Sequence, residues 1–265
     1  MRLIRVDYPY AKCLRRFEPC HPHFTFTMTK LLIATKNQGK YQGIKTVLSS
    51  LPVELISLDY LQIDDSLFIE DGKTFAENAE KKAKFYSKKS KLMTLADDSG
   101  IEVEALQGEL GIKTRRWGLG EKASDEEWLN FFLKRMEKEK NRRAKFISCI
   151  CLADKDGNVL AVGEGEVQGT LTEDIQASLK PGVPLSSIFL PDGSTKVHSA
   201  MTFAEKEKIS HRGKALRPIK EYLKNFCQEK TTASVTTLQR VECSNRSRTI
   251  RTSSTGPRIF PEIFE

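Results

Sequence analysis

The sequence predicts an α/β protein in which a mixed β-sheet is flanked by helices. Three observations support this fold class: short apolar runs alternate with helical patterns, capping sequences open two of the helices, and a turn signal joins two β-rich segments. A chain of 265 residues is long enough for one well-buried domain of this kind, or for two small ones.

Each element follows from a local pattern. Strands are expected over residues 30–35, 53–57, 92–96, 144–152 and 159–167. Helices are expected over residues 37–50, 74–89, 124–136 and 210–226, with Pro218 favouring a kink in the last. Thr74 and Ser124 each precede a Glu at capping-box spacing, and Asp156-Gly157-Asn158 is typical of a hairpin turn. The regular pattern is therefore confined to the middle of the chain.

The two ends of the sequence differ from this middle region. Residues 1–28 have no helical or strand period and are expected to form a disordered extension. Residues 228–265 are rich in Ser, Thr and Arg with little to bury, and are expected to form a disordered tail. The working domain is therefore predicted over residues 29–227.

The net charge of +8 does not predict a nucleic-acid-binding protein. Residues 1–29 contain five Lys/Arg and two Asp/Glu, and residues 228–265 contain six and four, so the ends carry five of the eight excess charges. A nearly balanced middle region is a poor electrostatic footprint for DNA or RNA. No apolar run approaches the ~20 residues that span a bilayer. Six cysteines without a C-x-x-C pair favour free thiols, so a cytoplasmic protein is expected.

Residues 35–40, Thr-Lys-Asn-Gln-Gly-Lys, join the first strand to the first helix. Such a turn can direct several backbone N–H groups at an anion, and Lys40 suits a phosphate better than it suits the helix dipole. The Walker A pattern is absent, and taken alone an ordinary strand–helix turn is the more frequent interpretation. This segment is therefore a candidate phosphate loop that needs support from other motifs.

Two acidic segments provide that support. Asp97 and Asp98 directly follow the third strand, and Glu70-Asp71-Gly72 precedes a helix. Adjacent carboxylates repel each other, and Mg²⁺ relieves this repulsion with hard oxygen ligands. A simple turn capped by Asp is the alternative. Lys206, His211 and Arg212 add a basic side, although a His-Arg pair is more often a solvated surface feature. The combination favours metal-assisted phosphoryl chemistry.

Four segments resemble, in the same order, the motifs of the inosine triphosphate pyrophosphatase or Ham1-like family. They are Ala-Thr-Lys-Asn-Gln-Gly-Lys at 34–40, Glu-Asp-Gly-Lys-Thr-Phe-Ala-Glu-Asn-Ala at 70–79, Ala-Asp-Asp-Ser-Gly-Ile at 96–101 and Ile-Ser-His-Arg-Gly-Lys-Ala-Leu at 209–216. The resemblance implies a homodimer with an elongated mixed sheet and a substrate cleft between two lobes. It also implies Mg²⁺-dependent hydrolysis of ITP, dITP and XTP to the monophosphate and pyrophosphate, which removes deaminated purines from the nucleotide pool.

The resemblance also implies a role for individual residues. Asp98 is expected to be the general base, and Glu70, Asp97 and Asp98 the metal ligands. Expected substrate contacts come from Thr35, Asn37, Lys40, Ser99, Val183, Ser186, Lys206, His211 and Arg212. Lys206 is assigned to phosphate, while His211 and Arg212 are assigned to the 6-oxo edge of the base. Adenine carries an amino group at this edge, so donors there would face a donor.

The chain departs from the family pattern in one loop. The family has Gly-Phe-Gly-Tyr-Asp-Pro before Ile-Phe, whereas this chain has Gly-Val-Pro-Leu-Ser-Ser at 182–187. Val183 offers less stacking surface than an aromatic ring, so we expect base affinity to fall roughly 10- to 100-fold. Lesser departures are Glu207 in place of Asn and Leu110 in place of Pro. The alternative function is a non-catalytic or altered-specificity nucleotide-binding protein of the same fold.

Overall fold

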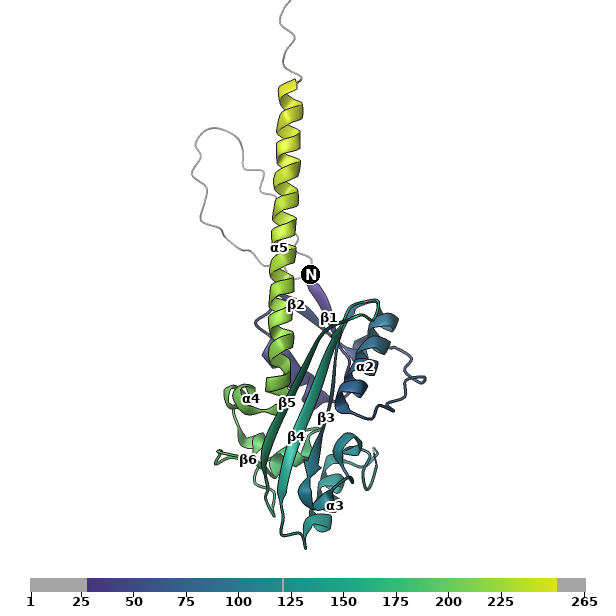
Figure 1. The fold of residues 1–265 in the computed structure, drawn as a ribbon, viewed down its shortest axis with the longest axis vertical. Coiled ribbons are helices and arrows are strands. Elements are labelled where there is room, and N and C mark those ends of the chain that lie inside the picture. Colours follow the sequence, from purple (N-terminus) through teal and green to yellow (C-terminus); the bar gives the residue numbers. More distant parts are fainter. Residues whose placement is uncertain (1–27, 121, 252–265) are drawn as a thin grey trace, which may run out of the picture.

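The computed structural model describes residues 28–120 and 122–251, and its centre is a six-stranded mixed sheet with the order β2-β1-β3-β4-β5-β6 (Figure 1). The strands are β1 (Thr29–Ile33), β2 (Val53–Ser57), β3 (Met93–Val103), β4 (Arg143–Ala153), β5 (Val159–Leu171) and β6 (Phe189–Pro191). β1 is parallel to both β2 and β3, and the remaining pairs are antiparallel. The predicted mixed sheet is confirmed.

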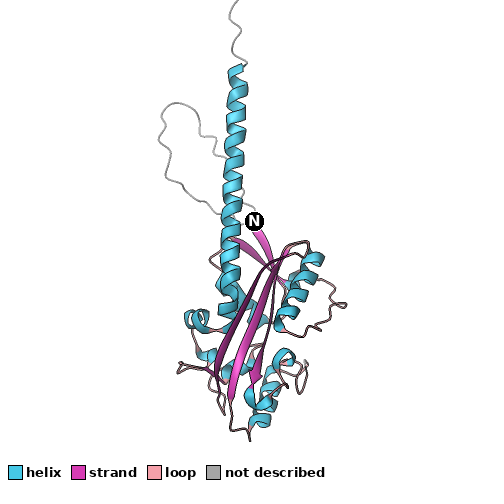
Figure 2. Cartoon of the chain, viewed as in Figure 1, coloured by secondary structure: helices cyan, strands magenta, loops and turns pink. Residues whose placement is uncertain are grey.

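Helices cover both faces of this sheet (Figure 2). They are α1 (Gln38–Leu48), α2 (Phe75–Ser90), α3 (Asp125–Met136), α4 (Phe203–Ile209) and α5 (His211–Arg251). Thr74 caps α2 by accepting a hydrogen bond from the Glu77 N–H, and Ser124 with Glu127 forms a full capping box on α3. The predicted helix starts at these two sites are therefore confirmed.

Alternation along the strands distributes the core between these helices. Leu31 and Ile33 pack in one apolar cluster with α1 and α5, while Leu32 packs on the opposite face with α2. Successive strand side chains point to opposite faces, so one buried strand serves both layers. A third cluster gathers α3 with the far ends of β3 to β6. The two ends of the long sheet thus have separate cores, which matches the expectation of two lobes.

Two glycines on β5 determine how closely α5 approaches the sheet. A Cβ atom at Gly163 would lie 2.0 Å from the Ala215 carbonyl oxygen, and one at Gly165 would lie 2.1 Å from that of His211. Any larger residue would push the helix away. The start of α5, which carries predicted site residues, is therefore held tightly against β5.

The C-terminal part of α5 differs from the prediction. The sequence favours a disordered tail from residue 228, whereas the structure continues as a helix to Arg251. Extending a helix adds a hydrogen bond per residue without a new nucleation penalty, so a segment with little to bury can follow a well-packed one. Residues 1–27 and 252–265, which include the rest of both predicted disordered ends, lie outside the described residues.

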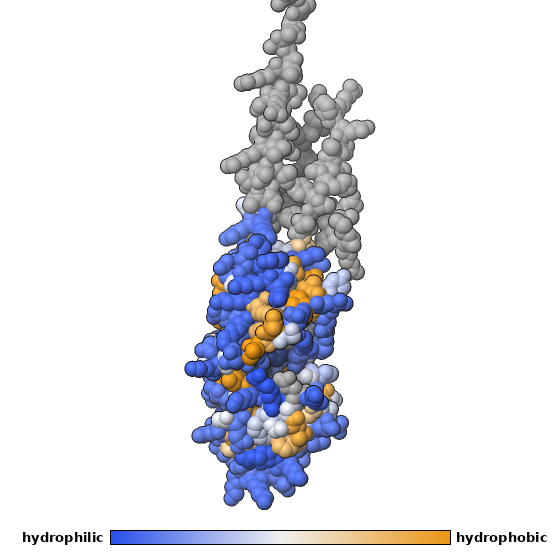
Figure 3. Space-filling model, turned by 90° about the vertical axis from the view of Figure 1, so that its right-hand side faces the viewer, coloured by the Kyte–Doolittle hydropathy of each residue, from blue (hydrophilic) through white to orange (hydrophobic). Residues whose placement is uncertain are grey.

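The face of the molecule drawn in Figure 3 is mostly hydrophilic, with smaller apolar areas between the polar ones. Within the described ranges, every helix is too short or too polar to cross a bilayer.

Candidate active site

The candidate site lies where β1 separates from β3. β1 pairs with β3 only from Leu31 to Ile33, opposite Met93 to Leu95, whereas β3 continues to Val103 paired with β4. One edge of β3 is therefore free of β1 beyond this point, and the carboxyl end of β1 turns into α1. Ligands of open α/β sheets bind at such switch points. A cavity of about 970 Å³ lies here, lined by the β1–α1 loop, β3, the 180–186 loop and the start of α5.

Asp97 and Asp98 lie within β3, which continues to Val103 instead of ending at residue 96 as predicted, so the alternative of a simple turn is wrong. They pair with Ile150 and Cys149 of β4 in a continuous antiparallel ladder. Asp, Ser and Gly have low strand propensity, but pairing along β4 outweighs that local preference. Consecutive strand residues face opposite sides of a sheet. The two carboxylates therefore have different surroundings and different properties.

Asp97 is enclosed by hydrogen-bond donors and cations. Its Oδ1 accepts a hydrogen bond from the Ser148 hydroxyl at 2.8 Å, and its Oδ2 accepts one from Arg212 Nε at 3.0 Å. Lys40 Nζ lies 3.6 Å from the same Oδ2. Burial alone would raise the pKa of Asp97, but Lys40, Arg212 and the Ser148 hydroxyl lower it well below its ordinary value. Asp97 is thus placed to anchor two cations, and both of its oxygens are engaged, which disfavours its predicted role as a metal ligand.

Asp98 has the opposite environment. Its side chain is buried, Oδ1 accepts a hydrogen bond from the Ser99 N–H at 3.1 Å, and Oδ2 has no hydrogen-bond partner among the described residues. Burial raises the pKa of Asp98 and Glu70 adds to this effect, whereas Lys40, Lys82 and the nearby Asn78 side-chain amide oppose it. Neighbouring carboxylates with pKa values shifted in opposite directions are the usual arrangement for divided acid–base roles. Asp98 is the carboxylate suited to accept a proton.

Glu70 lies on the Asp98 side of the sheet and forms a 2.6 Å ion pair with Lys82. Burial raises the pKa of Glu70, but Lys82, Arg116 and Lys40 together lower it overall. No group of three or more His, Cys, Asp or Glu side chains suited to a metal ion lies within the described residues. Mg²⁺ requires fewer, because one or two carboxylates with substrate phosphates and water complete its shell. Glu70 and the unpartnered Asp98 Oδ2 fit this donor set.

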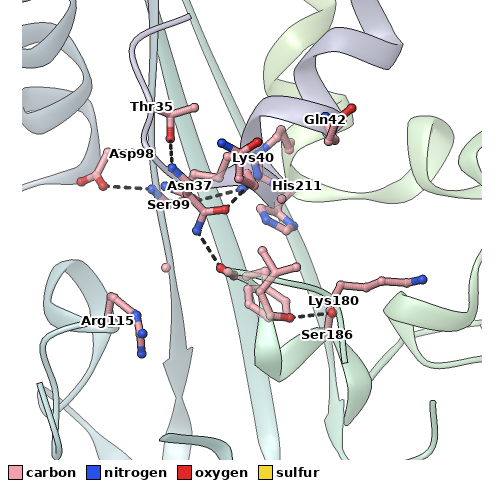
Figure 4. A pocket seen from close by; sticks show the side chains of 18 of the residues that line it. Thr35, Asn37, Lys40, Gln42, Asp98, Ser99, Arg115, Lys180, Ser186 and His211 are labelled. Carbon is pink, nitrogen blue, oxygen red and sulfur yellow. Dashed lines mark hydrogen bonds between the residues drawn. The ribbon is translucent and has the colours of Figure 1, made fainter. Parts of the chain in front are cut away.

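The predicted phosphate loop opens α1. Asn37 is the N-cap: its Oδ1 accepts a hydrogen bond from the Lys40 N–H at 3.0 Å. Its Nδ2 donates to the Gly182 carbonyl at 2.7 Å, and the Thr35 hydroxyl accepts from the Asn37 N–H at 3.1 Å. The side chain of Asn37 therefore makes two hydrogen bonds within the protein and also lines the cavity, and its predicted substrate contact stays a prediction. It joins the loop to the base side of the cavity (Figure 4).

Lys40 projects into this cavity from the first turn of α1, as expected. Its side chain is only 15% exposed, and burial lowers its pKa, with Asp97 acting in the opposite direction. The first turn of α1 contains no acidic residue that would compete for its free N–H groups. A helix N-terminus with a nearby lysine is a suitable place for a phosphate.

Arg212 lines the cavity as expected, and two of its guanidinium nitrogens have protein partners that the sequence did not predict. Its Nε binds Asp97, and its Nη2 donates to the Ser99 hydroxyl at 3.0 Å. Its guanidinium is therefore fixed against β3 instead of being free to face a base. Ser99 and Arg212 both line the cavity, but the structure makes them partners of each other.

The far end of the cavity is aromatic. His211 stacks on Phe146 with ring centroids 4.9 Å apart, and His198 lies 5.8 Å from His211. Burial lowers the pKa of His198 to about 3 and that of His211 well below its ordinary value. Both imidazoles are therefore neutral at pH 7. His198 Nε2 and His211 Nδ1 have no hydrogen-bond partner among the described residues.

The predicted base-contact residues Val183 and Ser186 also line the cavity. Lys206, which the resemblance assigns to phosphate, lines it as well and lies near His198, whose pKa it helps to lower. The Ser186 hydroxyl donates to the Val183 carbonyl at 2.7 Å, which fixes the loop. Sequence reasoning missed several residues that line the same cavity: Lys82, Arg116, Phe146, Lys180, His198 and Phe203. Lys82 was hidden in a lysine-rich helix, and the others stand outside any motif. Only the folded structure identifies these residues, because they come from separate segments and line the same cavity.

This arrangement is that of an α/β enzyme acting on phosphorylated substrates, with an anion-binding loop, a buried carboxylate and an aromatic recess around one cavity. Comparison with known proteins is consistent with this class. The chain belongs to the Ham1 family, whose model matches residues 31–222. Two curated relatives are both described as dITP/XTP pyrophosphatases. The Aquifex aeolicus protein is 37% identical over 74% of this chain and 97% of its own length, and the Deinococcus deserti protein is 38% identical over 71% and 86%.

Solved structures show the same fold. The Ham1 protein of Staphylococcus aureus has a TM-score of 0.60 and 30% identity, covering 74% of this chain and 99% of its own. A HAM1 protein from Coxiella burnetii has a TM-score of 0.62 and 28% identity, covering 74% and 98%.

Proposed function

We propose that this chain is a nucleoside triphosphate pyrophosphohydrolase that converts ITP, dITP and XTP to the monophosphate and pyrophosphate. The contrast between the two neighbouring aspartates carries the proposal. Asp97 is paired with cations, whereas Asp98 has a raised pKa and a buried oxygen without a hydrogen-bond partner among the described residues, and it lines the same cavity as Lys40. The description of the relatives as dITP/XTP pyrophosphatases supports this substrate class.

Each group has a defined task in this reaction. The α1 N-terminus and Lys40 bind the triphosphate, and Asp98 takes a proton from the attacking water. The P–O bond between the α- and β-phosphates breaks, and the water adds across it to give the monophosphate and pyrophosphate. Glu70 and Asp98 would hold Mg²⁺, which supplies positive charge to the phosphate oxygens when bound. Asp97 keeps Lys40 and Arg212 in place.

The aromatic end of the cavity receives the base. Lys206 can donate to a purine oxygen, and a neutral imidazole can donate from one ring nitrogen and accept at the other. A 6-oxo group accepts hydrogen bonds, whereas the 6-amino group of adenine donates them. Hypoxanthine and xanthine are therefore the expected bases. A homodimer and a cytoplasmic location also belong to this proposal: the first rests on the family resemblance, and the second on the pattern of cysteines in the sequence.

The test is pyrophosphate release from ITP, XTP, dITP, GTP and ATP in the presence of Mg²⁺. We expect release from the first three and a fall of roughly 10²- to 10⁴-fold in Asp98→Asn. Asp156→Asn, on an exposed turn far from the cavity, is the matched control and should behave as the parent. Binding of ITP without any release would instead support a non-catalytic nucleotide-binding protein. Equal rates on ATP and ITP would exclude selection of deaminated purines.

A further inference from the structure

The base end of the cavity carries positive charge that the protein does not neutralise. Lys206 is partly buried there, and Lys180 lies close enough to contribute, after burial, to the lowering of the Lys206 pKa. Both line the cavity, and among the described residues neither has a carboxylate within ion-pair distance. Like charges held together without a counter-ion are unfavourable, so an anion at this point would be stabilised.

The other ionisable groups at this end do not change that charge. Glu207 lines the cavity but pairs with Lys220 at 3.3 Å, and Glu205 pairs with Lys196 at 3.0 Å. His198 and His211 are neutral, because burial lowers both pKa values below the physiological range. Asp125 accepts a hydrogen bond from the Gly182 N–H at 2.6 Å and lies 3.9 Å from Arg115, and Arg212 pairs with Asp97 at 3.0 Å. Lys180 and Lys206 are therefore the lysines at the base end that have no ion-pair partner among the described residues.

The anion at this position is not expected to be the triphosphate. The phosphate-binding elements lie at the opposite end, around Lys40 and Asp98, and Figure 4 shows Asp98 and Lys180 on opposite sides of the pocket. His211 lies between them, next to Lys40, and Ser186 lies beside Lys180. A nucleotide with its phosphates at Lys40 places its base toward Lys180. The anionic group that fits is the base itself.

We propose that Lys180 is a specificity-determining residue that, together with Lys206, selects a purine whose base is negatively charged. Among deaminated purines this means xanthine, which loses a ring proton near neutral pH, whereas hypoxanthine remains neutral. The proposal rests on the proposed function and narrows it: XTP is preferred over ITP and dITP, and the preference is electrostatic in origin.

The test is the ratio of kcat/KM for XTP to that for ITP, measured from pH 5 to pH 7.5 at low ionic strength. In the parent the ratio should rise with pH as xanthine ionises. Lys180→Gln should lower the ratio roughly three- to tenfold at pH 7.5 and much less at pH 5, as expected for two charges about 6 Å apart in a medium of intermediate dielectric constant. Lys180→Glu should lower it further. Lys134→Gln removes an exposed lysine on α3, outside the cavity, and should keep the parental ratio.

Three results would overturn the proposal. The first is a ratio that does not change in Lys180→Gln, and the second is a ratio in the parent that is independent of pH. The third is an equal loss for both substrates, which would identify Lys180 as a phosphate contact. Failure of the proposed function is separate, because it appears as a parent that releases pyrophosphate from neither triphosphate. In that case calorimetric binding of XMP and IMP to the same variants still tests Lys180.

Discussion

The two ends of the cavity treat charge in opposite ways. At the phosphate end Asp97 engages Arg212, Lys40 and Ser148, so folding alone completes the network around this carboxylate. At the base end two lysines lack a counter-ion, and two neutral imidazoles each leave one nitrogen without a partner among the described residues. A completed network fixes geometry before the substrate arrives, whereas an incomplete one gains its partners from the ligand. We infer that the phosphate end of the cavity positions the catalytic groups, whereas the base end recognises the substrate.

The largest effect on stability is expected when the completed network is broken. Asp97→Asn leaves two buried cations without their shared carboxylate, so we expect the free energy of unfolding in urea to fall by roughly 3–5 kcal/mol. Asp192→Asn, which removes an exposed partner of Arg143, is the control and should cause no measurable change. Replacing Arg212 by Met together with Asp97→Asn should cost less than the sum of the single changes. Additive losses would show that the pair is not coupled.

A smaller effect, dependent on pH, is expected at the incomplete end. The pKa of folded His198 is lowered to about 3 from an ordinary value of 6.5. The unfolded chain therefore binds a proton that the folded chain does not, so stability is unaffected above pH 6.5 and declines as pH falls below it. His198→Gln removes one such group, and its unfolding free energy should fall less than that of the parent between pH 7 and pH 4.5. Parallel curves for the two proteins would mean that folding does not lower the pKa of His198.

Much of the fold was predictable because each local signal agrees with the tertiary structure. The capped starts of α2 and α3, the β4–β5 hairpin and the buried pattern of β1 are all local. The exceptions depend on distant partners. The middle of β3 is a strand because β4 pairs with it, and α5 continues to Arg251 because its first half is packed against β5.

The residue types of the candidate site could be predicted from the sequence, whereas the roles of the individual residues were harder to predict. Adjacent aspartates are equivalent in a turn, and only the strand conformation places Asp97 with Arg212 and Asp98 near Glu70. A predicted third strand that continued through Asp97 and Asp98 would have placed these two side chains on opposite faces of the sheet, because strand side chains alternate. Arg212 pairs with Asp97, which is 115 residues away in the chain, and Lys180 lies near Lys206 only in the folded structure, so the sequence contains no spacing signal for either contact.

The smallest effect is expected at Asn37, which connects the two ends. Its Oδ1 caps α1, and its Nδ2 holds the Gly182 carbonyl, so one side chain joins the phosphate loop to the base loop. Asn37→Ser keeps a capping oxygen but loses the donor, and should leave stability within about 0.5 kcal/mol while raising KM for ITP several-fold. Asn37→Ala loses both contacts and should also destabilise the protein by about 1 kcal/mol. The measurements are urea unfolding and steady-state pyrophosphate release. If Asn37→Ser has the parental KM, the base loop is positioned by its other contact, the hydrogen bond from the Gly182 N–H to Asp125. The phosphate end and the base end of the cavity would then be independent, and Asn37 would not couple the phosphate loop to recognition of the base.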